Sequence, residues 1–315
     1  MKVALCFIVS YEHIIHKEQL WIDWIQPNQD IINIYFHYKD FNKIKSSWIK
    51  KHSIPSKFIK HTSYFNVVPA YISLLNYAFY HDYDNHWFCL LTESCVPIIS
   101  PYKFRKMFMQ YYFSSIIRCK PAYWNITLHR RANLQHLHTQ FWLANDPWFT
   151  LCRDHVFKCL LFTHKHRNTF ELINAGGLAN ESLFAIILQT FNELTNNHTF
   201  INSSSNICDW TRMTSPTSPY LFKEHNTDNF NVIIKLLKEN KHAIFLRKVH
   251  QDFPDSIIHN IMEIDFHPII ETHTHYYFTF TYFFTFLYNF LIPSIVPIFF
   301  TIFFTKRFMN SHFFT

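Results

Sequence analysis

Short apolar runs of strand length alternate with amphipathic segments through the first part of this chain. The runs are VALCFIVS, IINIYFHY and HWFCLL, and between them lie HKEQLWIDWI and VVPAYISLLNYAFY. The two longer segments place their apolar residues at helical spacing. Short strands that are apolar throughout are typical of a parallel sheet buried on both faces. The sequence therefore predicts an α/β fold with an open, mostly parallel sheet flanked by helices.

The remainder of the chain continues this pattern less regularly. We expect helices in PYKFRKMFMQYY, after the turn at Asp146-Pro147, from about Asn180 and in FNVIIKLLKEN, and strands in NICDWTRM and HAIFLRKVH. No internal repeat is evident. We predict one catalytic domain over residues 1–258. It is followed by a polar connector over 259–275, an apolar segment over 276–305 and a short tail over 306–315.

The apolar segment from Tyr276 to Thr305 contains no charged residue. It exceeds the roughly 18 apolar residues that indicate a spanning helix, and membrane helices tolerate prolines such as Pro293 and Pro297. We predict a transmembrane or membrane-anchoring segment, with a buried aromatic tail or a Phe/Thr-rich extension under no structural selection as the alternatives. The start, MKVALCFIVS, does not resemble a secretory signal. An anchored tail would leave the domain in the cytosol, whereas Lys306-Arg307 favours a cytosolic C-terminus, so the topology stays open.

Composition excludes several classes of site. The chain has only 2 glycines in 315 residues, and it contains no P-loop, GxGxxG, HExxH or GxSxG motif. Its seven cysteines form no CxxC pair, which favours reduced thiols over a zinc ribbon or a disulfide framework. The abundance of Ile, Asn, Lys, Phe and Tyr is typical of AT-rich coding, as in large DNA viruses or intracellular parasites.

The formal charge is +7 and the sequence pI is about 8.9. These values are compatible with a phosphate-bearing ligand, a nucleic acid or an anionic membrane. The densest basic stretch, Lys43 to His61, interleaves lysines with Trp48 and Phe58. No nucleic-acid-binding motif accompanies it, so we interpret it as a solvated loop and helix face. Nucleic-acid binding through this stretch is a remote alternative.

No metal site is expected. Asp82-Tyr83-Asp84 has the DxD pattern by which many sugar transferases hold a metal, but it precedes the strand HWFCLL. Ligands of an open α/β sheet lie at the opposite, carboxyl ends of the strands. The closely spaced histidine pairs lack a third ligand at metal spacing.

The stretch WFCLLTESCVPIIS, residues 87–100, ends a predicted strand in polar residues. Ser94 or Cys95 beside Glu93 could be a nucleophile with its base. The same residues could instead form the rim of a binding site. Without a GxSxG elbow, the first interpretation is the weaker one.

Other polar residues also stand where predicted elements end or begin. Glu181 follows Gly176-Gly177, Asp209-Trp210 ends one strand, and Arg247-Lys248 ends another. Because ligands bind outside the carboxyl ends of strands, these residues are candidates for one site. An Arg-Lys pair suits a diphosphate, since Arg offers a planar fork and Lys a point charge. A carboxylate near a helix start is often only a capping charge. The residues alone indicate a nucleotide-dependent α/β enzyme.

The order of these motifs resembles the core-2/I-branching β-1,6-N-acetylglucosaminyltransferase family, from about Val3 to Val249. INIYFHY is similar to the family's second strand, and LLTESCVP to its Leu-Leu-Ser-Glu-Ser-Cys-x-Pro motif, with Thr92 for the first Ser. DPWFTLCRDHV resembles the Trp-x-x-Leu-x-Arg segment. LANESLF stands in place of Pro-Asp-Glu, NICDWTR in place of Val-Asp-Trp, and FLRKV in place of Phe-x-Arg-Lys-Phe.

The resemblance implies a GT-A-like fold and an inverting, metal-independent transfer from a UDP-sugar, usually UDP-GlcNAc, to a glycan or glycoprotein hydroxyl. It makes Glu181 the catalytic base and Lys248 the group that neutralises the departing diphosphate, assisted by Arg247. Glu93 and Ser94 would line the donor site. Asp209 and Trp210 would flank the acceptor. No cofactor and no nucleic-acid partner are implied.

The chain departs from the family pattern in three places. Ala179-Asn180 replaces Pro-Asp before the glutamate. A further phosphate-binding arginine has no evident counterpart, and Lys223 is a possible substitute. The family's N-terminal anchor is absent. These departures leave open a catalytically degenerate relative that binds a glycan or a nucleotide sugar without turnover.

Overall fold

The computed structural model describes residues 1–264, apart from Tyr64, Tyr123, Trp124, Leu128, His129, Asn196, Pro216 and His225. These residues belong to one compact unit, residues 1–268. In the described part, no helix is both long and apolar enough to cross a membrane. The segment 276–305 lies outside the described residues, so its role as a membrane anchor stays a prediction.

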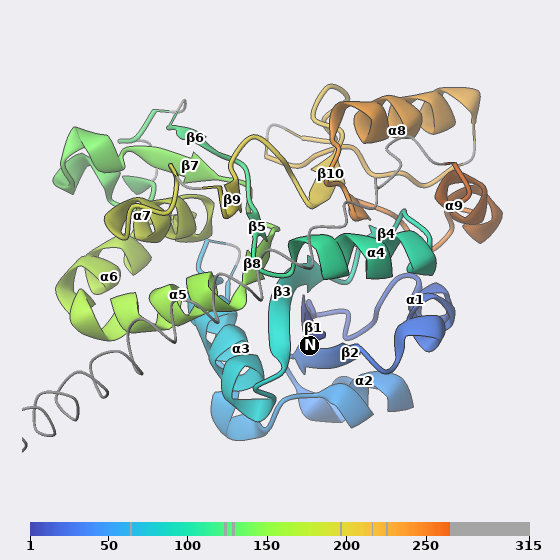
Figure 1. Ribbon diagram of the computed structural model, residues 1–315, viewed down its shortest axis with the longest axis horizontal. Coiled ribbons are helices and arrows are strands. Elements are labelled where there is room, and N and C mark those ends of the chain that lie inside the picture. The colour runs from blue at the N-terminus through green and yellow to red at the C-terminus, as the bar shows by residue number, and fades with distance from the viewer. Residues whose placement is uncertain are drawn as a thin grey trace, which may run out of the picture. The chain divides into compact units, whose positions relative to one another are not determined.

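A six-stranded mixed sheet forms the centre of this unit (Figure 1). Its strand order is β2-β1-β3-β8-β5-β9. The pairs β1–β2, β1–β3 and β5–β9 are parallel, and β8 runs antiparallel to both β3 and β5. The six strands are β1 (Lys2–Ile8), β2 (Ile32–His37), β3 (Asn85–Thr92), β5 (Ser115–Ile116), β8 (Thr150–Cys152) and β9 (Thr199–Phe200). The predicted α/β class, with helices flanking the sheet, is confirmed.

Helices cover both faces of the sheet, as the wholly apolar strands require. Along β1, Cys6 faces the cluster built with α3 (Val68–His81) and α5 (Arg153–Lys165). Its neighbour Phe7 instead contacts Trp21 of α1 (Glu18–Ile25), with ring centroids 5.0 Å apart. Successive side chains of a strand point to opposite faces. Figure 1 accordingly shows α1 and α4 (Pro101–Tyr111) on one side of β1–β3, and α3 and α5 on the other.

A second, three-stranded sheet carries the C-terminal part of the described chain. It consists of β10 (Asn206–Cys208), β11 (Phe245–Arg247) and β4 (Val96–Pro97). Beside it lie α8 (Thr227–Glu239) and α9 (Asp255–Met262) (Figure 1). The predicted domain limit at residue 258 falls inside α9, and the extent of the catalytic domain stays a prediction.

Several short elements between residues 115 and 200 were not expected from the sequence. Strands β5, β8 and β9 are only two or three residues long, too short to show a periodicity of their own. A two-stranded sheet of β6 (Cys119–Pro121) and β7 (Leu143–Asn145) lies in the same part of the chain. The remaining helices are α2 (Ser47–His52), α6 (Arg167–Asn174) and α7 (Leu183–Thr190).

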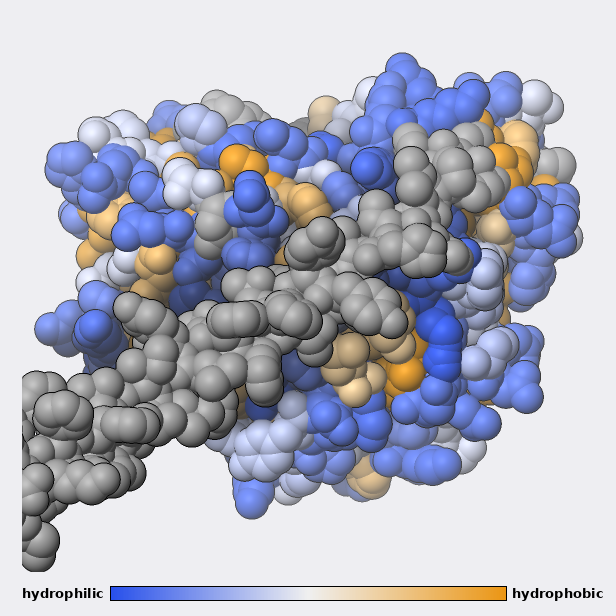
Figure 2. All heavy atoms as spheres, viewed as in Figure 1, coloured by the Kyte–Doolittle hydropathy of each residue, from blue (hydrophilic) through white to orange (hydrophobic). Residues whose placement is uncertain are grey.

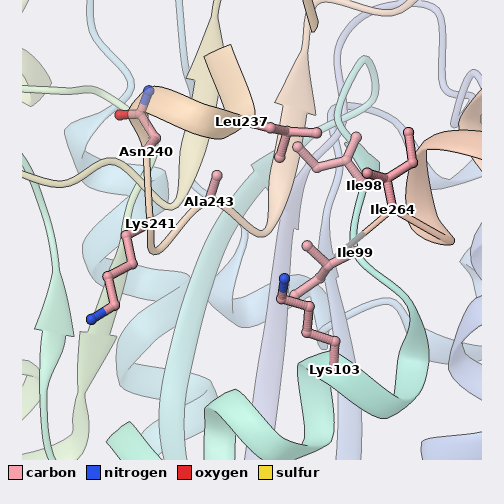
Figure 3. A pocket seen from close by; sticks show the side chains of 8 residues that line it. All are labelled: Ile98, Ile99, Lys103, Leu237, Asn240, Lys241, Ala243 and Ile264. Atoms are coloured by element: carbon pink, nitrogen blue, oxygen red, sulfur yellow. The ribbon is translucent and has the colours of Figure 1, made fainter. Parts of the chain in front are cut away.

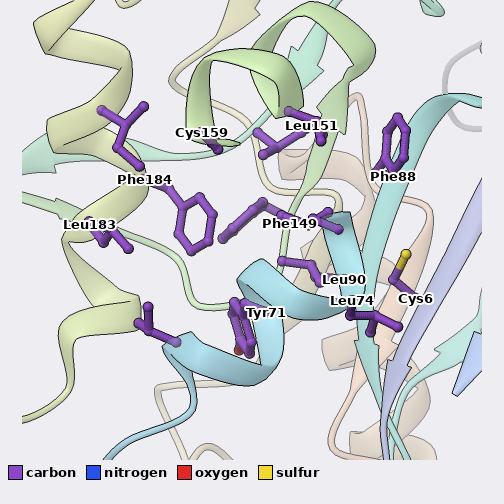
Figure 4. Packing of buried hydrophobic residues seen from close by; sticks show 14 of the residues in the cluster. Cys6, Tyr71, Leu74, Phe88, Leu90, Phe149, Leu151, Cys159, Leu183 and Phe184 are labelled. Carbon is purple, nitrogen blue, oxygen red and sulfur yellow. The ribbon is translucent and has the colours of Figure 1, made fainter. Parts of the chain in front are cut away.

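A large hydrophobic cluster lies between the central sheet and helices α3, α5 and α7 (Figure 4). Phe149 stands at its centre, fully buried, with its ring centroid 4.6 Å from that of Phe184. Its carbonyl accepts a 2.9 Å hydrogen bond from the Leu90 amide. Tyr71 of α3 packs on the other side of Phe184, at 5.9 Å. The cluster therefore joins the sheet to the segment that carries Glu181, just before α7.

We expect Phe149→Ala to lower the free energy of unfolding by about 3–5 kcal/mol, because it removes a buried ring and leaves a cavity. The control is Phe157→Ala on α5, where the ring is 48% exposed and the loss should be small. Urea unfolding followed by circular dichroism measures both. Equal losses in the two variants would contradict this account of the core.

Candidate active site

The turn after β3 is tied to the end of the second sheet. Val249 donates its amide to the Ser94 carbonyl at 2.9 Å, and β4 pairs with β11 through Val96 and Leu246. These main-chain contacts place Arg247 and Lys248 beside the residues that end β3. The structure thus brings together the two ends of strands that the sequence analysis singled out, and their use as one binding site stays a prediction.

Ser94 and Cys95 hold this turn together. Ser94 Oγ lies 3.2 Å from Thr92 Oγ1, and Cys95 Sγ accepts the Thr92 amide at 3.4 Å. Both residues are buried, and burial raises the pKa of the Cys95 thiol. Within the described residues, no histidine or carboxylate hydrogen-bonds to either side chain. The geometry thus favours a structural turn over a nucleophile with its base.

Arg247 and Lys248 form the cationic part of the site. Arg247 Nε donates to Thr92 Oγ1 at 3.4 Å, and its guanidinium carbon lies 5.1 Å from the centroid of the Trp148 ring. Lys248 Nζ lies 3.2 Å from Ser218 Oγ. Burial and the neighbouring Arg247 lower the pKa of Lys248, while Glu93 raises it. Because two adjacent cations repel each other, they form a favourable binding site for a multivalent anion.

The predicted base, Glu181, lies in the 3-10 turn Ala179–Glu181, directly ahead of α7. Its side chain is 28% exposed, and its Oε2 lies 3.4 Å from Arg131 Nη1. Burial raises the pKa of Glu181 above its ordinary 4.5; Arg131 lowers it, and the nearby Asp146 raises it further. The carboxylate is therefore accessible, ionisable and only partly neutralised, as a general base needs to be.

Tyr71 lies close enough to Arg247 and to Glu181 for both charges to act on its hydroxyl. Burial raises the pKa of Tyr71; Arg247 lowers it, and Cys95 and Glu181 raise it further. Its ring centroid is 5.5 Å from that of Trp148, the ring that Arg247 overlies. Its hydroxyl donates to the Pro147 carbonyl at 3.0 Å. Tyr71 thus contacts the ring that Arg247 overlies, and the charges of Arg247 and Glu181 both act on its hydroxyl.

Arg131 is a site residue that the sequence did not indicate. It lies in a turn where Arg130, Ala132 and Asn133 all adopt left-handed backbone angles, with φ of 48°, 49° and 50°. Such angles are costly for residues other than glycine, and they persist only where the surroundings enforce them. Here the Ala132 amide donates to the Gly177 carbonyl at 2.8 Å. The possible signal in the sequence was the chain's only glycine pair, a few residues before Glu181.

Gly176 is needed because this turn passes directly over it. A Cβ at position 176 would lie 2.4 Å from the Asn133 nitrogen and 2.6 Å from the Arg130 oxygen. Both atoms belong to the backbone and cannot rotate away. The glycine thus allows the close approach that brings Arg131 to Glu181.

The predicted acceptor residues have different surroundings. Asp209 is buried, and its carboxylate accepts hydrogen bonds from Thr211 and from Arg212, whose Nε lies at 2.6 Å. Trp210, next to it, is 50% exposed. Asp209 therefore fixes the loop that presents Trp210, and only Trp210 offers a free surface. Contact of either residue with an acceptor stays a prediction.

Two other predicted residues border the cationic part of the site. Glu93 is half-buried, and its carbonyl accepts the His16 amide at 3.0 Å. Lys223 is exposed and follows Phe222, which exchanges main-chain hydrogen bonds with Lys248 and His250 at 2.9 Å. Neither observation tests the predicted donor contacts.

The DxD sequence lies away from the cluster, as the sequence predicted. Asp82 caps the end of α3, ahead of β3, and accepts the Lys2 ammonium at 2.9 Å. Burial alone would raise the pKa of Asp82, but hydrogen bonds from Lys2, the Asp84 amide and Asn33 bring it down to about 2. Asp82 is therefore already paired with a lysine. It also lies at the amino end of β3, opposite to the edge where an open α/β sheet binds ligands.

One other group of side chains could in principle hold a metal. The ligand atoms of Asp154, His155 and Glu193 lie within 4.8 Å of one another. Lys158 bridges both of these carboxylates with its ammonium group. His155 meanwhile bonds Ser115 Oγ at 2.7 Å. The cluster is therefore already internally paired, and it contains none of the predicted site residues.

A small pocket lies on another part of the unit, where α8 and the residues before β11 meet α4 (Figure 3). It also contains none of the predicted site residues. Its lining residues are Ile98, Ile99, Lys103, Leu237, Asn240, Lys241, Ala243 and Ile264.

The protein has an α/β fold, with a cation pair where β11 ends and a partly buried carboxylate ahead of α7. The sequence profile of the Core-2/I-Branching enzyme family matches residues 3–234. The chain therefore belongs to this family of glycosyltransferases. The match includes Glu93, Glu181 and Asp209, whereas Arg247 and Lys248 lie beyond it. No curated protein matches the chain.

We expect Gly176→Ala to lower the melting temperature and to separate Arg131 from Glu181, because the new methyl group meets backbone atoms. Overpacking of this kind costs about 1–3 kcal/mol. The control is Ala175→Ser, which adds one atom at the exposed neighbouring position. Differential scanning calorimetry compares the two variants. A stability equal to wild type for Gly176→Ala would contradict the described approach of the turn.

Proposed function

We propose that this chain is an inverting glycosyltransferase that moves a sugar from a UDP-sugar to a hydroxyl of a glycan or glycoprotein. Glu181 is the base and Lys248, with Arg247, receives the diphosphate. The observation that carries the proposal is that a partly buried carboxylate, Glu181, and the cation Arg247, next to Lys248, lie near enough to the same tyrosine, Tyr71, for both charges to act on it. Membership in the family supports the class of reaction.

The reaction follows from this separation of charge. Glu181 takes the proton of the acceptor hydroxyl as its oxygen forms a bond to the anomeric carbon. The bond from that carbon to the β-phosphate oxygen breaks, and its electron pair leaves with UDP. Arg247 and Lys248 stabilise the negative charge that develops on the diphosphate. No enzyme nucleophile is required, which agrees with the structural role of Ser94 and Cys95 in the turn.

The donor sugar is proposed to be GlcNAc, by analogy with the family. The exposed ring of Trp210 offers an apolar face for the acceptor, since aromatic side chains combine apolar surface with restricted flexibility. Asp209 would act through the position of this ring. Glu93, close to Lys248, would limit the space on the donor side. We propose that no divalent metal takes part, because the cation pair can meet the charge that a metal would otherwise neutralise.

We expect Glu181→Gln to reduce kcat by about 10²–10⁴-fold, the usual contribution of a general base, while UDP binding is kept. The control is Glu171→Gln on α6, an exposed carboxylate paired with Arg167, which should leave kcat unchanged. Turnover of UDP-GlcNAc and a panel of UDP-sugars is assayed with EDTA present. Unchanged kcat in Glu181→Gln would refute the role of the base, and loss of wild-type turnover on chelation would refute metal independence.

The pH dependence gives a second test, in which two variants should shift the pKa of Glu181 in opposite directions. A base must be deprotonated, so kcat/KM should fall as the pH drops through the pKa of Glu181, which burial has raised. Arg131→Met removes a charge that lowers this pKa, and should move the acidic limb to higher pH. Asp146→Asn removes a charge that raises it, and should move the limb to lower pH. Shifts in the same direction would contradict the assignment of this limb to Glu181.

The second candidate function is a catalytically degenerate relative that binds a nucleotide sugar or a glycan. It is prompted by Ala179-Asn180 ahead of the base and by the pairing of Glu181 with Arg131. This candidate predicts that wild type binds UDP but transfers no sugar, and that Glu181→Gln binds it equally well. Measurable transfer by the wild-type chain decides against it.

A further inference from the structure

Six exposed lysines lie between residues 43 and 60, on the segment that follows β2. They are Lys43, Lys45, Lys50, Lys51, Lys57 and Lys60, named here the lysine patch. No aspartate or glutamate occurs between residues 41 and 81. The positive charge of this surface is therefore not balanced by its own segment. In the view of Figure 2, the surface around α2 is predominantly hydrophilic.

The lysines have few partners within the unit. Lys43 lies 3.8 Å from Asp40, and Lys57 lies over the Phe58 ring at 5.2 Å. Among the described residues, no salt bridge involves Lys45, Lys50, Lys51 or Lys60. Because like charges held together repel, such a surface is suited to an external polyanionic partner.

The patch is a fixed surface. The Ser46 hydroxyl caps α2 by accepting the Ile49 amide at 3.1 Å, and Ile49 and Ile54 are buried beneath it. The Ile54 amide donates to the Phe36 carbonyl of β2 at 3.0 Å. The lysines are therefore presented together by backbone that is bonded to the central sheet.

The surface lacks features for reading nucleic acid. It has no arginine, the residue suited to bidentate phosphate and base contacts. Trp48 packs its ring against Phe36 at 5.0 Å, and Phe58 packs against Tyr77 at 4.9 Å, so neither ring is presented for base stacking. Phe41, 43% exposed, lies at the edge of the patch. Diffuse lysine charge with an exposed aromatic residue at its margin suits lipid headgroups.

We infer that the lysine patch docks the enzyme on a membrane surface that carries anionic phospholipids. The last lysine of the patch, Lys60, lies at the carboxyl edge of the sheet, where its amide donates to His37 Nε2 at 2.9 Å. His37 and Thr92 both align with Ile8, so this edge also holds the candidate active site. Docking there holds the site close to acceptors on the membrane. The inference does not depend on the proposed reaction, because binding is measured without turnover.

The test is co-sedimentation of the full chain with vesicles of neutral phosphatidylcholine and with vesicles containing about 30% phosphatidylserine, a composition that gives a negative surface potential. The patch variant carries Lys45→Gln, Lys50→Gln, Lys51→Gln and Lys57→Gln. The matched control carries Lys165→Gln, Lys235→Gln, Lys238→Gln and Lys241→Gln, four exposed lysines on α5, on α8 and just after it. Both variants lose the same charge, and their melting temperatures verify folding.

We expect wild type and control to bind anionic vesicles at least about tenfold more tightly than the patch variant, given the contribution of each lysine near such a surface. Raising the salt on wild type should weaken the anionic component alone. Any binding by the predicted apolar tail is common to neutral vesicles and all variants, and cancels in the comparison. Equal loss in patch and control variants, or no preference for anionic vesicles, would overturn the inference. Patch-dependent binding of a single-stranded oligonucleotide without vesicle binding would also overturn it.

Discussion

The candidate site depends on the junction between two sheets, where the turn after β3 is bonded to the segment that continues β11. The Val249 amide reaches the Ser94 carbonyl at 2.9 Å, and the Ile98 amide reaches the Ile244 carbonyl at 3.0 Å. These are main-chain contacts, so they fix the path of the chain whatever the side chains are. They bring Arg247 and Lys248, from the end of the described chain, to the edge where β1, β2 and β3 finish. This junction is what places the cations, which follow the three-stranded sheet, next to the strand ends of the six-stranded sheet.

The opposite side of the site depends on a different contact, the approach of the residue 130–133 turn to Gly176. This approach brings a guanidinium to the carboxylate that we propose as the base. Burial favours the protonated carboxyl and Arg131 favours the ionised form, so the two effects oppose each other. Glu181 is thus a partly exposed carboxylate whose pKa is raised by burial and lowered by Arg131. In the proposed transfer, this base removes a proton from the acceptor and the cation pair accepts the departing anion.

Sequence reasoning predicted the parts of this architecture that carry a local signal. The apolar runs at residues 3–10, 31–38 and 86–91 became β1, β2 and β3, and Ser100-Pro101 began α4 with Ser100 capping the Lys103 amide at 3.2 Å. The end-of-strand positions of Asp209 and Lys248 were also predictable. Strands β5, β8 and β9 were not, because pairing with neighbours, rather than their own two or three residues, defines them. Arg131 was missed for the same reason: its position is set by Gly176 and Gly177, about 45 residues later in the sequence. The proposed catalytic role of Glu181 came from the family resemblance alone.

The central claim is that the acceptor hydroxyl, activated by Glu181, displaces UDP directly from the face opposite the cation pair. The most direct measurement is the anomeric configuration of the glycoside formed from an α-linked UDP-sugar, read from proton NMR coupling constants. Direct displacement predicts a β-linked product. An α-linked product would require a second displacement or a different attacking face, and it would contradict the account.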